Sequence, residues 1–386
     1  MPFLLKELNH LLTNKFVTMI EYNYVVGIIC RTYNQSKYIL DTLNGFVMQK
    51  TNFPYVIIVV DDASTDGEQK VIESFILNQF DTSDTTFYNK KETDYAHIIC
   101  ARHKLNSYCH IVAMYLKENH YSQHKDIIAY LNQWLSHTKY EAICEGDDYW
   151  IDPLKLQKQV DFLEAHPDYT MCCSDAVIKA PDEELDWCRY SQNQTIPTEA
   201  IIKNGGAFIQ TATLLFRKEL MLNADDYPEA AQKCHVGDFP LQIYAALKGK
   251  VYWFAEKQTV YRYNWSSSWT NNFKKQDINI RIKNIRSEID MLQSMDKLSN
   301  HIYSDAFRKI ECILVYHIFY NYPKQYKQII DAFPDVVNNF STKRKVDLFL
   351  IKWHCINLIK LRKNAKPKKI VKSIINSLKG KNKKQN

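Results

Sequence analysis

Two short apolar runs with a helical pattern between them constrain the fold of this chain more than any other feature. The runs are Tyr24–Cys30 and Pro54–Val60, and each is typical of a strand buried on both faces. The apolar residues that fall on one helical face between them are Ile39, Leu40, Leu43, Phe46 and Val47. A β-α-β unit requires parallel strands, so the sequence predicts an α/β protein with a mostly parallel sheet.

Polar residues follow both strands. Arg31–Ser36 forms a polar turn after the first run, and Asp61–Gly67 supplies carboxylates after the second. Parallel strands end at the same edge of a sheet, and in open α/β sheets ligands bind outside the carboxyl ends of the strands. This edge is therefore the expected ligand site.

A third apolar run, within Glu141–Asp152, stops at the adjacent carboxylates Asp147 and Asp148. Two ionised carboxylates repel each other and are tolerated when a cation or a hydroxyl-bearing ligand lies between them, so they are candidates for metal and ligand binding. Alone, they could equally be ordinary turn residues. Asp152 and Pro153 predict the start of a helix over 153–165.

Phosphate-binding glycine loops are missing from the sequence. Neither GxGxxG nor GxxxxGKS is present, which disfavours a dehydrogenase or a P-loop enzyme. Carboxylates and aromatic side chains can instead hold a nucleotide by its base and ribose and leave the diphosphate to a metal ion.

From about Tyr24 to Trp269 the residues resemble the family-2 nucleotide-sugar glycosyltransferases of the GT-A fold. The resemblance rests on Thr32-Tyr33-Asn34, Asp61 to Asp66, Glu145 to Trp150, and Gly237-Asp238. It implies a GT-A type three-layer α/β/α sandwich over residues 23–270, in an enzyme of the bacterial surface-polysaccharide type.

The resemblance also implies roles for individual residues. Asp238 would be the general base that accepts the proton of the acceptor hydroxyl, and such a carboxylate works best when burial raises its pKa. Tyr33 would stack near the base, and Asp62 would accept a hydrogen bond from the imide N–H of that base. Asp147 would hold the ribose side, and Asp148, with Asp147, would bind Mn²⁺ or Mg²⁺. The donor nucleotide set is completed by Thr32, Asn34, Arg102 and Arg262.

Each assignment has a plain structural alternative. Tyr33 could be a half-buried aromatic, Asp62 a helix cap, and Asp238 the N-cap of a helix over 239–248. Arg102 could belong to a solvated basic loop. Asn264 stands where some members of the family carry a metal-binding histidine, so a third protein ligand is in doubt, although water and two phosphates can complete the shell.

Other elements are predicted by pattern alone. Residues 110–135 predict two helices, and Thr170–Asp175 predicts a strand. Residues 180–200 predict an irregular acidic loop, and Gly205–Phe216 predicts a strand that in the family lies beside the acceptor site. Residues 1–22 form an N-terminal extension with no assigned role, and residues 271–342 form a helical region.

The end of the chain is strongly basic. Residues 343–386 contain fifteen Lys or Arg and one acidic residue, so the net charge of +7 combines a tail of +14 with a body of −7. Five apolar residues of the tail share one helical face: Ile370, Val371, Ile374, Ile375 and Leu378. This pattern favours an anionic membrane surface over a solvated helix or a nucleic-acid-binding tail, and no nucleic acid is expected as a partner.

Cysteine spacing and hydropathy indicate the compartment. The ten cysteines form no CxxC pair, so buried free thiols are expected, as in a reducing cytosol. The sequence shows no signal peptide and no apolar run long enough to span a bilayer. The expected location is cytoplasmic, peripheral on the inner face of the cell membrane.

These observations predict an inverting glycosyltransferase that moves a sugar from a nucleotide donor, a UDP-sugar, to a hydroxyl of a growing glycan. The basic tail favours a lipid-linked acceptor, as in capsule, exopolysaccharide or O-antigen assembly. Two alternatives stay open: a catalytically silent nucleotide-sugar-binding scaffold, and a sugar nucleotidyltransferase, which would be expected to carry a glycine-rich phosphate loop.

Overall fold

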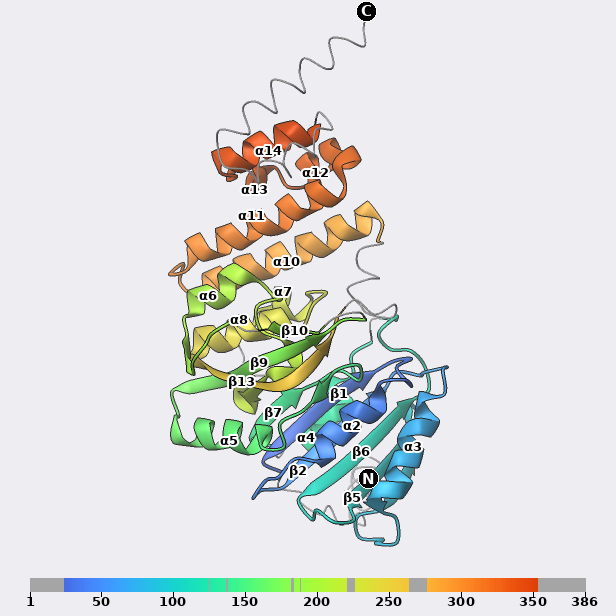
Figure 1. Ribbon diagram of the computed structural model, residues 1–386. Helices are drawn as coiled ribbons and strands as arrows, with labels where there is room; N and C mark the ends of the chain where they lie inside the picture. Colours follow the sequence, from blue (N-terminus) through green and yellow to red (C-terminus); the bar gives the residue numbers. More distant parts are fainter. Residues whose placement is uncertain are drawn as a thin grey trace, which may run out of the picture.

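The computed structural model describes residues 24–123, 125–136, 138–181, 184–187, 189–220, 226–263 and 276–352. Their centre is a run of four parallel strands in the order β7 (Tyr140–Ile143), β1 (Val26–Thr32), β2 (Tyr55–Asp61) and β6 (Cys109–Leu116). Nearly all of their side chains are buried, as the continuous apolar runs predict. The expected parallel α/β sheet is confirmed in this central part (Figure 1).

Antiparallel strands extend this centre on both sides. On the β6 side lie β5 (Ala96–His103), β3 (Phe80–Asp81) and β4 (Asn89–Glu92). On the β7 side, β12 (Leu215–Arg217) joins β7 to β9 (Tyr169–Lys179). The sheet continues with β13 (Lys250–Arg262), which also pairs with β8 (Tyr149–Trp150) and β11 (Gln194–Ile196), while β10 (Glu184–Trp187) pairs with β9.

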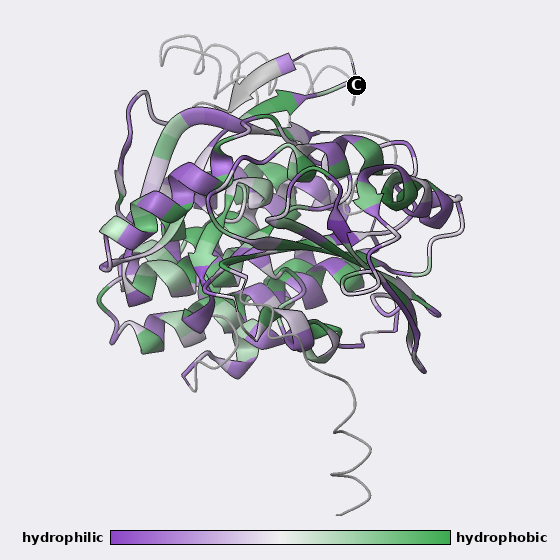
Figure 2. Ribbon diagram, turned by 90° about the horizontal axis from the view of Figure 1, so that it is seen from below, coloured by the Kyte–Doolittle hydropathy of each residue, from purple (hydrophilic) through white to green (hydrophobic). Residues whose placement is uncertain are grey.

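Helices cover both faces of the sheet. One core joins the sheet to α2 (Ile39–Val47), α3 (Glu68–Gln79) and α5 (Lys155–Ala165). On the opposite face of β2, β5 and β6, α4 (Ile128–Leu135) contributes Leu131 and Leu135. Figure 2 shows mostly hydrophobic central strands between helices whose outer faces are more polar. These three layers agree with the predicted sandwich.

A third core lies around β9 and β13. It contains residues of α6 (Thr198–Asn204), α7 (Glu229–Gln232), α8 (Asp238–Lys248), α10 (Ile278–Leu298) and α11 (Ser304–Asn321). The described residues also form three short 3₁₀ turns, η1 (Thr211–Thr213), η2 (Lys218–Leu220) and η3 (Pro323–Gln325). Helices α10 and α11 therefore join the sheet to the C-terminal part of the chain (Figure 1).

The C-terminal part is helical, as predicted. Helices α12 (Tyr326–Ala332), α13 (Pro334–Asn338) and α14 (Thr342–Lys352) follow α11 and share a small core with it. Leu348 and Ile351 of α14 are buried in it, so the first residues of the predicted basic tail take part in this packing. The amphipathic pattern after Pro367 lies outside the described residues. No helix in the described ranges is long and apolar enough to cross a membrane.

Several sequence predictions of local structure were wrong. Residues 109–116 form the buried strand β6 instead of a helix, so α4 is the only α-helix described between 110 and 135. A short continuous apolar run fits either element, and here burial on both faces decided for a strand. Only Leu215–Arg217 of the strand predicted over 205–216 is extended, and residues predicted as an irregular loop contain β10 and β11. The described cysteines are free thiols, as expected.

Candidate functional site

The carboxyl ends of β1, β2 and β7 lie side by side, and the polar residues that follow these strands meet there. Thr32 pairs with Asp61 across β1 and β2, and Ile29 pairs with Ile143 across β1 and β7. Backbone hydrogen bonds continue beyond the ladders, from Gly146 N to Arg31 O at 3.1 Å. The structure therefore brings together most of the predicted donor-binding and metal-binding residues: Thr32, Tyr33, Asn34, Asp62, Asp147 and Asp148.

The loops after β1 and β2 hold each other in place. Asn34 has a left-handed backbone (φ 54°), and its N–H donates to Ser64 Oγ at 2.9 Å, while its side-chain oxygen accepts from Thr65 N at 2.7 Å. Glu68, at the start of α3, accepts hydrogen bonds from Thr32 Oγ1, Gln35 N and Ser64 Oγ. Thr32 and Asn34 thus shape the loop, while Tyr33 lies 46% exposed at its tip.

Asp62 is anchored to a third segment. Its two carboxylate oxygens accept the backbone N–H groups of His120 at 2.7 Å and Tyr121 at 3.1 Å. The amide of Asn119 also donates to Asp62 O at 3.2 Å. A carboxylate has about four lone-pair sites, so Asp62 keeps acceptor capacity for a ligand N–H.

The turn after β7 presents alternate side chains to opposite sides. Glu145 and Asp147 are partly exposed, whereas Gly146 is buried and Asp148 is only 3% exposed. Gly146 is required by close approach, because a Cβ there would lie 2.3 Å from Thr32 Oγ1. Glu145 and Asp147 therefore form the accessible carboxylate pair at this edge.

Asp148 points into the fold. Its Oδ1 accepts from Arg262 N at 2.9 Å, and its Oδ2 accepts from the Gln210 amide at 2.7 Å. Burial, together with the charges of Asp147 and Glu145, raises the pKa of Asp148 well above its usual range. Metal ligation by Asp148 stays a prediction, but these contacts give its carboxylate a structural role that ties β7 to β13.

Arg262 is also committed to protein contacts. Its guanidinium pairs with Asp41 and donates to Asp147 O. The guanidinium carbon lies 5.0 Å from the ring centre of Tyr38 and 4.5 Å from that of Tyr149, and the residue is 5% exposed. Arg262 thus stabilises the carboxylate turn, and its predicted contact with phosphate stays a prediction.

Asp238 reaches the same edge from the first turn of α8. Its Oδ2 accepts from Thr211 Oγ1 at 2.8 Å, and its Oδ1 accepts from Phe239 N at 2.9 Å. Burial raises the pKa of Asp238. Burial and the negative charges of Asp238 and Asp147 raise the pKa of Glu145 to about 7, so the three carboxylates interact at one place.

Arg102 is not brought to this edge. It lies on β5 opposite His110, near the beginning of β6, whereas Tyr115 at the other end of β6 pairs with Asp61. Its guanidinium pairs with Asp84 at 2.6 Å and stacks 4.2 Å from the Phe87 ring centre. Because β5 runs antiparallel to β6, Arg102 lies at the opposite end of the sheet, and we correct its assignment by leaving it out of the site.

Four residues of the site were missed as site residues in the sequence. Glu145 precedes Asp147 by two positions, and Gln210 and Thr211 support Asp148 and Asp238. The fourth, Arg31, follows Ile29 by two positions on β1. The available signal for Glu145 and Arg31 was the period of two along a strand, which places them on one face with Ile143 and Ile29. Gln210 and Thr211 gave no such signal.

Metal binding at this edge is chemically suitable but incomplete in protein ligands. Glu145 and Asp147 offer the oxygen donors that Mg²⁺ and Mn²⁺ prefer. Across the described ranges, no group of three or more His, Cys, Asp or Glu side chains is arranged to hold a metal. Ligand phosphates and water would have to complete the shell, and Asn264 lies outside the described residues.

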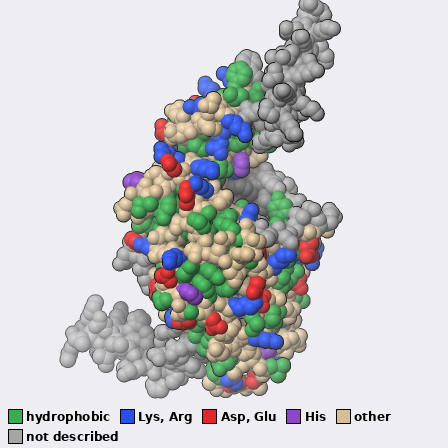
Figure 3. Space-filling view, turned by 60° about the vertical axis from the view of Figure 1, so that its left-hand side comes forward, with side chains coloured by type: hydrophobic (Ala, Val, Ile, Leu, Met, Phe, Trp, Pro, Cys, Tyr) green, Lys and Arg blue, Asp and Glu red, His purple; other side chains and the backbone are tan. Residues whose placement is uncertain are grey.

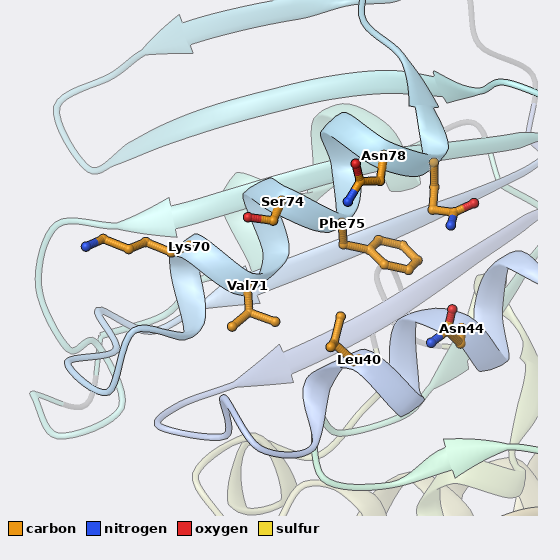
Figure 4. A pocket seen from close by; sticks show the side chains of 8 residues that line it. Leu40, Asn44, Lys70, Val71, Ser74, Phe75 and Asn78 are labelled. Carbon is orange, nitrogen blue, oxygen red and sulfur yellow. The ribbon is translucent and has the colours of Figure 1, made fainter.

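A separate open groove lies between α2 and α3. Its volume is about 530 Å³, with Leu40, Val71 and Phe75 pointing into it and Asn44 and Asn78 beside them (Figure 4). None of the predicted site residues lines this groove. The candidate site is therefore the strand-end edge and not this depression.

Solved structures with similar architecture define the fold class. Residues 1–349 of TarS from S. aureus in complex with UDP-GlcNAc match with a TM-score of 0.53 and 13% identity, covering 86% of this chain and 88% of that one. The same protein in complex with UDP matches with a TM-score of 0.52 and 15% identity over the same shares. The chain has a GT-A-like fold with a helical C-terminal region.

Sequence comparisons define the family of the domain. Residues 28–92, which contain β1, β2 and their polar loops, match the family model described as Glycosyl transferase family 2. This segment of the chain is therefore similar to a glycosyl transferase family 2 domain. Uncharacterized proteins of Mycobacterium tuberculosis and Mycobacterium bovis are each 28% identical over 258 residues, or 64% of this chain. The chain spans 63% of the length of these curated relatives.

Proposed function

We propose that the protein is an inverting glycosyltransferase that moves a sugar from a nucleotide-sugar donor to a hydroxyl group of a glycan. One observation carries this proposal: Glu145, Asp147 and Asp238, from two different elements, interact at the carboxyl edge of the sheet beside the family-2 match. A carboxylate pair suits the donor side of the reaction, and a separate half-buried carboxylate suits the acceptor side.

The proposed chemistry is a single displacement. Asp238 accepts the proton of the acceptor hydroxyl as its oxygen attacks the anomeric carbon, and the bond to the nucleoside diphosphate breaks. Thr211 donates to Asp238 Oδ2 and so fixes the orientation of the base. The raised pKa of Asp238, caused by burial, increases its basicity toward the range in which general bases work near neutral pH.

The leaving diphosphate needs positive charge. A bound Mn²⁺ or Mg²⁺ would neutralise the developing negative charge of the leaving group, with Glu145 and Asp147 as its protein ligands. Burial is the main cause of the raised pKa of Glu145, and the repulsion from Asp238 and Asp147 adds to it; a cation there would relieve that repulsion. We propose a structural role for Asp148 and do not include it among the metal ligands, because its oxygens accept hydrogen bonds from Arg262 and Gln210.

We propose a UDP-sugar as donor, with Tyr33 and Asp62 at the base. Both residues lie at the strand-end edge, and the similar TarS structure was determined in complex with UDP-GlcNAc. The thermal unfolding midpoint of the purified protein should rise with UDP, and the rise should require Mn²⁺. A ligand at about a hundred times its Kd stabilises the folded state by about 2.7 kcal/mol, which is easily measured.

The panel of that experiment should contain UDP, GDP, ADP and CDP, each with and without Mn²⁺. A shift with GDP alone would indicate a GDP-sugar as donor in place of a UDP-sugar, and the proposed reaction would still be sugar transfer. The absence of any shift would contradict nucleotide binding at this edge, and with it both the enzyme and the nucleotide-sugar-binding scaffold. Where a shift is found, hydrolysis of UDP-sugars without acceptor separates a turning-over enzyme from a silent binder. In a separate assay, release of pyrophosphate from UTP and a sugar 1-phosphate would indicate a nucleotidyltransferase.

For the acceptor we propose a lipid-linked glycan of cell-surface polysaccharide synthesis, such as capsule or O-antigen, reached from the cytoplasmic face of the membrane. The support is the basic tail after residue 343. Lys and Arg side chains also gather on the C-terminal helical part in Figure 3, and Lys343, Lys345 and Lys352 of α14 are exposed. Basic segments bind anionic lipid surfaces by about 1 kcal/mol per cationic residue.

The full-length protein should therefore co-sediment with vesicles of anionic lipid at low salt and not with vesicles of neutral lipid. A variant with Lys368, Lys369, Lys372 and Lys379 changed to Gln should bind these vesicles less, because four positive charges that attract the anionic lipid surface are removed. Equal sedimentation of both proteins would remove the tail from this role, and no sedimentation of either would end the membrane proposal.

A further inference from the structure

Arg31 occupies the middle of the candidate site and has no assigned role. It is the second-to-last residue of β1 and pairs with Val60 of β2. Strand β1 lies between β2, which leads to Asp62, and β7, which leads to Glu145. The side chains of Ile29, Val60 and Ile143 mark one face of these strands, and a period of two places Arg31, Asp62 and Glu145 on that same face.

The charges of three carboxylates act on this guanidinium. Glu145, Asp126 and Asp62 all interact with Arg31 electrostatically and favour its charged form, although burial acts in the opposite direction and lowers the pKa of Arg31. The side chain is nevertheless exposed to solvent. Arg31 is thus the exposed residue of the otherwise buried strand β1, and its side chain is accessible to a ligand at this edge.

The guanidinium of Arg31 has unused donors. Arg262 and Arg102 are both committed to ion pairs and aromatic rings, whereas Arg31 makes no side-chain hydrogen bond or ion pair within the described part of the chain. A guanidinium offers five N–H donors in a planar fork that matches oxygen acceptors. The nearby carboxylates favour its charge without occupying these donors.

We propose that Arg31 binds the donor nucleotide directly, by donating hydrogen bonds to one of its oxygen atoms. This inference rests on the proposed function. A nucleoside diphosphate presents mainly oxygen acceptors, namely base carbonyls and phosphate oxygens, while Asp62, Glu145 and Asp147 are acceptors themselves. Arg31 supplies the complementary donor beside Asp62 and Glu145, whose charges act on its guanidinium.

The test measures the Kd of UDP by calorimetry, in the presence of Mn²⁺, for the wild type and for Arg31→Ala. We expect UDP affinity to fall about tenfold to a hundredfold, because hydrogen bonds to charged groups are the stronger kind. The unfolding midpoint without nucleotide should change little, since the guanidinium makes no side-chain hydrogen bond or ion pair in the described part of the chain and interacts with the nearby carboxylates only through their charges. Arg308→Ala, which removes one exposed arginine from α11, is the matched control and should bind UDP normally.

Two further arms identify the oxygen. If uridine loses affinity by the same factor as UDP, Arg31 contacts the base or ribose; if only UDP loses affinity, it contacts the diphosphate. Arg31→Ala with wild-type UDP affinity overturns the proposal, as does a loss that disappears at high salt, which indicates long-range charge alone. If the wild type itself binds no nucleoside diphosphate, the proposed function fails, a result distinct from failure at Arg31.

Discussion

Replacing Asp238 with Asn is expected to reduce the rate of sugar transfer by about 10² to 10⁴-fold, the usual contribution of a positioned general base. The amide cannot accept the proton of the acceptor hydroxyl, yet it keeps the size of the carboxylate and can still accept from Thr211. Donor binding should change little, because Asp238 serves the acceptor side. The measurement is steady-state transfer to acceptor beside the UDP affinity of the same preparation.

The pH profile adds a signature that a purely structural role would not give. The base works only when ionised, so kcat/KM should fall as the pH drops through the pKa of Asp238. Since burial raises that pKa, the fall should occur above the range of an ordinary aspartate, which ionises near pH 3.9. In Asp238→Asn this limb of the profile should disappear.

Asp305→Asn is the matched control for this variant, because Asp305 also lies in the first turn of a helix but is exposed and outside the site. It should transfer sugar at the wild-type rate. Full activity in Asp238→Asn would show that Asp238 is not the general base. Its role would then be structural, as an acidic residue in the first turn of α8.

The strand-end site could be predicted because the sequence marks it by two independent regularities. The apolar runs of β1, β2 and β7 stop at polar residues, and parallel strands must end at a common edge. Knowledge of both was enough to place Asp62 and Asp147 together. The pattern predicted the parallel α/β sheet, and the resemblance of the motifs to family-2 glycosyltransferases implied the GT-A-like architecture.

The errors have a common physical origin, since each depended on which partner a strand would find. Residues 109–116 became β6 because β2 and β5 were available to pair with them on both sides. The antiparallel direction of β5 then carried Arg102 to the far end of the sheet, where Asp84 and Phe87 hold it. The residues around Arg102 do not indicate whether β5 runs parallel or antiparallel to its neighbour.

The sequence also did not indicate that Asp147 would be partly exposed and Asp148 buried. It depends on Gln210 and Arg262, which are distant along the chain and contact Asp148 only in the folded state. Two adjacent carboxylates in a turn face opposite ways, and the contacts with Arg262 of β13 and with Gln210 accompany the burial of Asp148.

A matched pair of variants, Asp147→Ala and Asp148→Ala, should separate these two roles. Asp147→Ala is expected to reduce transfer by at least about a hundredfold, because metal stabilisation of a leaving group is worth several kcal/mol. It should also abolish the Mn²⁺-dependent part of the UDP shift while leaving the unfolding midpoint of the free protein near that of the wild type. The partly exposed Asp147 side chain can be removed without opening the core.

Asp148→Ala should behave differently, because it leaves Arg262 N and the Gln210 amide buried without their acceptor. Each such group costs about 1 to 3 kcal/mol, so the unfolding midpoint of the free protein should fall. Measured below that midpoint, the UDP shift should still depend on Mn²⁺. The reverse result, in which Asp148→Ala keeps its midpoint and loses the Mn²⁺ dependence while Asp147→Ala retains it, would make Asp148 the metal ligand and Asp147 its neighbour on the ribose side.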